Sequence, residues 1–71
     1  MEYVTLTLIL FAGDAMLDGS QVYFNSHAEC NARIESIKSD VAPEVKIYQD
    51  ELGGWWFDSS STNQSIYAIC R

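Results

Sequence analysis

Two cysteines and the single histidine are the residues of this 71-residue chain whose chemistry is most distinctive. His27 and Cys30 lie three residues apart, which places two donor atoms on one face of a helix. Cys70 would add a third donor if the end of the chain packs nearby. A closed zinc site needs four ligands; an aspartate or glutamate could supply the fourth, but no further cysteine or histidine exists to do so. We therefore expect no metal site.

A cysteine nucleophile is the second chemistry that this spacing suggests. Cys30 falls in the first turn of a predicted helix, where the helix dipole lowers the pKa of a thiol, and His27 lies one turn earlier. However, Cys30 also belongs to an apolar stripe, and no residue pattern marks an oxyanion hole. No pair of carboxylates stands out, and Gly53-Gly54 lacks the lysine and the helix of a phosphate-binding loop. We therefore expect a protein that is not an enzyme and holds no cofactor.

Cys30 and Cys70 can instead pair with each other. In the chain-entropy model, closing a loop of about 40 residues stabilises a fold by ~4 kcal/mol, a large share of the stability of so small a domain. The alternative is two buried free thiols that act as small hydrophobic side chains, as in a cytosolic protein. The sequence favours proximity of the two sulfur atoms and leaves their redox state open.

Adjacent tryptophans give the clearest indication of function. Neighbouring residues of a strand point to opposite faces, so a helix that covers one face leaves either Trp55 or Trp56 on the other. Exposed aromatic patches anchor protein–protein contacts. The alternative places both indoles in the core, the second one covered by the loop at residues 59–65 or by the mate of a homodimer. The residues that we expect at the interface are Trp55, Trp56, Tyr48, Tyr67, Asp50, Glu51 and Asp58, with Tyr23 beside them.

The element that holds Cys30 is an amphipathic helix expected over residues 24–41. Ser26 is the predicted N-cap, and Glu29 completes a capping box in which its carboxylate accepts from the Ser26 amide. Pro43 ends the helix because it disfavours helical backbone at the residue before it. The apolar stripe of this helix comprises Cys30, Ile34, Ile37 and Val41.

Alternating apolar and polar residues predict five strands, at residues 3–11, 21–24, 45–49, 55–57 and 65–71. Gly13-Asp14 and Asp18-Gly19 punctuate the connection between the first two strands, and residues 50–54 form a turn. The predicted fold class is α+β: a small, mainly antiparallel sheet in the order β-β-α-β-β-β, with the amphipathic helix packed on one face. Residues 1–71 form a single domain of this kind.

The formal net charge of −6 argues against direct binding to nucleic acid or to an anionic membrane, because both require a basic surface. It suits a protein partner with a basic surface. The apolar run at residues 6–12 resembles the core of a secretory signal, but Glu2 and the lack of lysine or arginine before it favour a strand. The run is also too short to span a bilayer.

Two cysteine-containing motifs carry a resemblance. A strand leading into Phe-x-Ser-x-x-x-Cys, here residues 24–30, then a helix and a terminal Tyr-x-x-Cys, here residues 67–70, resembles small uncharacterised accessory proteins of bacteria and their phages. The C-terminal spacing is commonly tighter in those proteins, and many of them begin with a signal peptide. The resemblance implies an accessory gene product rather than an activity.

These observations together favour a phage-encoded, non-enzymatic interaction protein in the cytoplasm of an infected bacterium. It would bind and modulate or inhibit a host protein, with a nucleic-acid-handling protein suited to its acidity. One alternative is a virion component such as a capsid-decorating protein. Another is an exported, periplasmic domain stapled by the disulfide.

Overall fold

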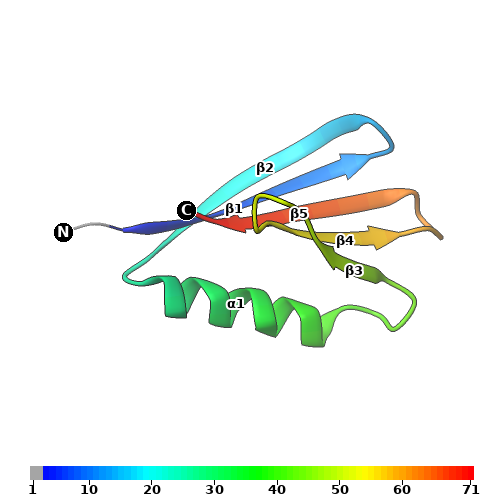
Figure 1. Cartoon of the computed structure of the whole chain (residues 1–71). Coiled ribbons are helices and arrows are strands. Elements are labelled where there is room, and N and C mark those ends of the chain that lie inside the picture. Colours follow the sequence, from blue (N-terminus) through cyan, green and yellow to red (C-terminus); the bar gives the residue numbers. More distant parts are fainter. Residues whose placement is uncertain (1–2) are drawn as a thin grey trace.

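The computed structural model describes residues 3–71, and that part of the chain folds as one helix and five strands (Figure 1). The single sheet is antiparallel throughout, in the order β2-β1-β5-β4-β3, so β2 and β3 are its edges. The predicted fold class and element order are confirmed. Met1 and Glu2, which the predicted domain includes, lie outside the described residues. The elements are β1 (Val4–Ala12), β2 (Ala15–Phe24), α1 (His27–Asp40), β3 (Lys46–Gln49), β4 (Trp55–Ser59) and β5 (Gln64–Cys70).

The helix is capped by the residues that the sequence predicts, with one change of partner. The Ser26 hydroxyl oxygen accepts a hydrogen bond from the Glu29 amide at 3.2 Å. The Glu29 carboxylate accepts from the Asn25 amide at 3.2 Å, one residue earlier than the predicted partner. Because the N-cap Ser26 is extended, α1 begins at His27 rather than at residue 24. It ends at Asp40, before the extended Val41.

The core lies between α1 and the central strands, on one face of the sheet (Figure 1). Leu6 of β1 and Cys30 of α1 are fully buried at its centre. Cys30 is joined to Cys70 of β5 as a disulfide, with Cα atoms 6.1 Å apart, so the predicted proximity is confirmed. The stripe of α1 also lies as predicted. The other residues at this core are Ile34, Phe57 and Ala68, buried, and Val4, Leu8, Phe24, Ile37, Val41, Val45, Ile47 and Trp55, partly buried.

The second strand is longer than the sequence predicts. It runs for ten residues, without a break at Asp18-Gly19. The register between β1 and β2 shifts between Leu10 and Phe11, so Leu17 is the extra residue of a bulge. The turn to β2 is Gly13-Asp14 alone, where Gly13 has the positive φ of 60° that the first position of a tight hairpin allows. Pairing with β1 thus overrides the turn tendency of Asp18-Gly19.

The last two strands also differ from their predicted bounds, and β5 ends at Cys70, one residue before its predicted end. β4 continues to Ser59, and β5 begins at Gln64, so the predicted loop at residues 59–65 shrinks to residues 60–63. In residues 3–71, α1 is the one helix, and it is neither long nor apolar enough to cross a membrane.

Candidate protein-interaction surface

The two tryptophans lie on opposite faces of β4. Trp55 faces α1 and packs against the core, and the Lys38 ammonium sits 3.3 Å from the centroid of one of its rings. Trp56, the next residue of the strand, points to the opposite face. The one helix of the described residues, α1, lies on the other side of the sheet (Figure 1). Trp55, one of the predicted interface residues, therefore does not share a face with the others.

Trp56 lies at the centre of a cluster of aromatic rings. The ring of Tyr67 lies 4.7 Å from it, that of Phe11 5.6 Å and that of Tyr48 6.5 Å, measured between centroids. Four neighbouring strands contribute one ring each, because Trp56 stands opposite both Tyr48 and Tyr67 in the sheet register. Phe11, Tyr48, Trp56 and Tyr67 are called the aromatic face below. The side chain of Tyr48 is 40% exposed, and the other three are half-buried.

Phe11 is the member of the aromatic face that the sequence did not single out. It falls on the less regular side of the first strand, which begins with Thr5 and Thr7 and ends with Ile9 and Phe11. That change from polar to apolar residues was the available signal. Tyr23, expected beside Trp56, lies at the other edge of the sheet, where its ring meets that of Tyr3 at 6.5 Å.

A glycine makes room for the most enclosed ring of the cluster. Tyr67 lies so close over Gly54 that a β-carbon there would overlap its hydroxyl and ring. The Tyr67 hydroxyl oxygen is shielded from solvent and has no hydrogen bond of ordinary geometry within the described residues. Gly53 serves a different purpose, since its φ of 87° closes the turn.

Asp50 anchors the turn beside this cluster. Its carboxylate accepts from the amides of Leu52 at 3.0 Å and Gly54 at 2.9 Å. Desolvation would raise the pKa of Asp50, but the nearby Tyr67 hydroxyl, and then the hydrogen bonds from the amides of Gly54 and Leu52, favour the carboxylate and lower the pKa. Desolvation raises the pKa of Tyr67, and the nearby Asp50 carboxylate raises it further. The turn and the aromatic face are therefore electrostatically linked.

The other two predicted acids differ in their contacts. Asp58 faces Lys46 across the β3–β4 pair, and its hydrogen bonding with Tyr48 is the main cause that raises the pKa of that phenol. The Lys46 ammonium lies 5.7 Å from the Tyr48 ring centroid. Glu51 is exposed in the turn. The structure thus places Asp50 and Asp58 next to the aromatic face, with Glu51 close in sequence to Asp50.

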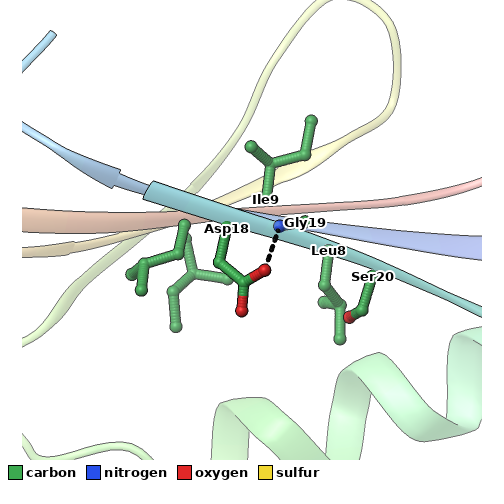
Figure 2. A pocket seen from close by; sticks show the side chains of 7 residues that line it. Leu8, Ile9, Asp18, Gly19 and Ser20 are labelled. Carbon is green, nitrogen blue, oxygen red and sulfur yellow. Dashed lines mark hydrogen bonds between the residues drawn. The ribbon is translucent and has the colours of Figure 1, made fainter. Parts of the chain in front are cut away.

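A shallow apolar hollow lies elsewhere, near β2. Figure 2 shows the Leu8, Asp18 and Ser20 side chains on the α1 side of the sheet and Ile9 on the other side. The one titratable side chain that lines this hollow is Asp18, which accepts from the Gly19 amide at 2.8 Å. The hollow therefore offers no pair of groups for acid–base catalysis.

The residues first considered for chemistry are not assembled into a reactive site. The disulfide engages both sulfur atoms, so neither Cys30 nor Cys70 is a thiolate ligand or nucleophile while the bond is intact. Within residues 3–71, no three histidine, cysteine or carboxylate side chains gather in a way that could hold a metal ion.

Comparisons of the chain with models of protein families, with curated proteins and with solved structures find no match. The geometry and charge of the surface itself therefore indicate its function.

Proposed function

We propose that this chain is a non-enzymatic interaction domain that binds a partner protein through the aromatic face. The observation that carries the proposal is the gathering of rings around Trp56 on the sheet face opposite α1. Tryptophan and tyrosine concentrate binding energy at protein interfaces, because they bury large apolar areas at low cost in side-chain entropy. A rigid sheet presents these rings in one fixed arrangement.

Charge selects the kind of partner. Asp50 and Asp58 border the aromatic face, and the chain as a whole carries a net charge of −6. A partner with basic residues around an apolar pocket would complement this surface and be steered towards it. Direct binding to nucleic acid is disfavoured by the same charge. A protein that itself handles nucleic acid fits, because its working surface is basic.

The resemblance to phage accessory proteins supports a host protein as the partner, which the chain would modulate or inhibit in the bacterial cytoplasm. The disulfide supports a second candidate, an exported domain that acts on its partner in an oxidising compartment. Disulfides persist in secreted and periplasmic proteins and are rare in the cytosol. Both candidates use the same aromatic face, and they differ in where the partner resides.

The test compares two aromatic-to-alanine variants on the same sheet face. The oxidised chain is used to capture partners from bacterial cytoplasmic and periplasmic fractions, and the affinity of the purified pair is then measured by calorimetry. Trp56→Ala should weaken binding by roughly 30-fold or more, as for a central interface tryptophan. Tyr3→Ala, at an exposed position far from Trp56, should leave the affinity unchanged.

Near-ultraviolet circular dichroism and thermal melting check that both variants remain folded. Equal affinities for the wild-type chain and a folded Trp56→Ala variant would refute the use of the aromatic face. Partner recovery from the periplasmic fraction alone would favour the exported domain over the cytoplasmic modulator.

A further inference from the structure

The outer edge of β2 is long, exposed and nearly uncharged. Every residue of the strand is exposed except Phe24, which is half-buried. Asp18 is its one charged residue, and it contains neither lysine nor proline. Natural sheets usually protect such edges with charges, prolines or a covering segment, because an open edge pairs readily with another strand. Apart from the bulge at Leu17, which lies at the start of the strand, the β2 edge has little of that protection.

The hydrogen bonding of β1 shows which groups of β2 point outward. The backbone groups of Thr5 and Arg71 form two hydrogen bonds with each other, at 2.7 and 2.9 Å. The N–H and C=O groups of Thr5 therefore point towards β5. The alternate residues Leu6 and Leu8 therefore direct theirs towards β2. Their partners in the register are Val22 and Ser20.

The residues of β2 that alternate with Ser20 and Val22 point their backbone groups in the opposite direction. Gly19, Gln21 and Tyr23 consequently point their backbone N–H and C=O groups away from β1, at the free edge of the sheet. The Gly19 amide donates to the carboxylate of Asp18, a neighbour on its own strand, which agrees with this direction.

We propose that β2 pairs antiparallel with β2 of a second copy of this chain, about a two-fold axis at Gln21. In this register Gln21 faces the partner's Gln21, and Gly19 faces the partner's Tyr23. Each outward N–H and C=O group of these three residues then gains a partner. The exposed Tyr23 ring would cover the position where the partner's Gly19 has no side chain, an arrangement that stabilises glycine in strands.

Charge favours a second copy over a basic peptide as the occupant of this edge. A basic peptide would be attracted by acidic residues along the strand, and β2 supplies Asp18 alone. In the two-fold register Asp18 stands opposite the partner's Phe24, so pairing brings no two acids face to face. The Gly19 amide exchanges its bond to Asp18 for the partner's Tyr23 carbonyl. The interface is thus self-complementary, as a two-fold contact requires.

The dimer would have a defined shape. Antiparallel pairing places the two-fold axis perpendicular to the sheet, so both α1 helices lie on one side and both aromatic faces on the other. Seven strand spacings of about 4.8 Å separate the two β4 strands, which puts the two Trp56 residues roughly 35 Å apart. The dimer proposal rests on the β2 edge and does not depend on the proposed function.

The test is the oligomeric state of the oxidised chain, measured by sedimentation equilibrium from low micromolar to near-millimolar concentration. We expect a mass that approaches twice the 8.0 kDa of one chain. Gln21→Pro should weaken the dimer by roughly 30-fold, because it removes the central donor from both copies. The proline costs no hydrogen bond within one chain, since the Gln21 amide points outward. Gln21→Ala is the matched control, which keeps that amide and should dimerise like the wild type.

A second variant covers the case in which Gln21→Pro does not fold. Gln21→Lys keeps the backbone donor but sets two ammonium groups against each other at the axis, so the dimer should weaken at low salt and recover as salt rises. A wild-type chain that stays monomeric at every concentration would overturn the proposal. A dimer that survives a folded Gln21→Pro variant but is lost in Trp56→Ala would also overturn it, because the mate would then lie on the aromatic face.

Discussion

Reduction of the Cys30–Cys70 disulfide should lower the free energy of unfolding by about 4 kcal/mol. The two cysteines are 40 residues apart in the sequence, and the bond removes the corresponding loop-closure entropy from the unfolded chain. In the chain-entropy model, a loop of this length gives about 13 cal/mol/K, or ~4 kcal/mol at 25 °C. A domain of this size typically has a total stability of roughly 4–10 kcal/mol. The reduced chain should therefore be close to the limit of stable folding.

Urea unfolding of the wild-type chain, followed by tryptophan fluorescence with and without a phosphine reductant, measures this difference. The thermal midpoint should fall by roughly 15–30 °C on reduction. The double variant Cys30→Ala/Cys70→Ala is the control, since the reductant should leave its unfolding curve unchanged. If the oxidised and reduced wild-type curves coincide, the disulfide does not constrain the unfolded chain as we argue.

The helix cap, the glycine turn and the tyrosine phenols should each respond measurably when they are perturbed. Ser26→Ala should cost about 1 kcal/mol in urea unfolding, because the Glu29 amide loses its acceptor. Gly54→Ala should destabilise by about 1–3 kcal/mol, since its β-carbon would displace the Tyr67 ring, and the tyrosine absorbance should change with it. The pKa values of Tyr48 and Tyr67 are raised, so the folded state favours the neutral phenols. Their stabilising contribution is complete below the ordinary tyrosine pKa of about 10 and is lost as pH rises through the folded values. An alkaline titration of phenolate absorbance should show two late tyrosines in the folded chain and none in urea.

The helix and the faces of the strands could be predicted because both follow from local rules. Ser26 and Glu29 define the start of α1 through short-range hydrogen bonds. The stripe that includes Ile34 follows from helical periodicity. Alternation likewise established that Trp55 and Trp56 lie on opposite faces. It did not establish which of them faces α1.

That choice depends on pairing between distant segments. Trp55 stands opposite Ala68, which is fully buried beneath the helix, and Trp56 stands opposite Tyr67. The register between β4 and β5 cannot be predicted from the residue types at positions 55 and 56. The same holds for Phe11, which joins the aromatic face through neighbours on strands that come much later in the chain.

The error at Asp18-Gly19 has a similar cause. Aspartate followed by glycine commonly forms a turn, but here the partner strand β1 is long enough to pair on both sides of it. The bulge at Leu17 absorbs the mismatch in length, and the Asp18 side chain satisfies the Gly19 amide. Pairing with β1 is therefore stronger than the local tendency of Asp18-Gly19 to form a turn. The local sequence does not show the strength of that pairing.

The disulfide and the aromatic face are connected through the small size of the fold. With few buried side chains, a chain of this length gains limited stability from apolar burial, and antiparallel sheets commonly leave one face to solvent. The Cys30–Cys70 bond adds stability to this one-sided core by constraining the unfolded chain. The face around Trp56 can then remain without a covering segment from its own chain. The bond lies on the α1 side of the sheet, away from the face proposed to bind a partner, so its loss should weaken the proposed binding only as far as it unfolds the chain. Calorimetric affinities of the oxidised and reduced chains, compared with their folded fractions, measure this, and a loss of affinity in a fully folded reduced chain would contradict it.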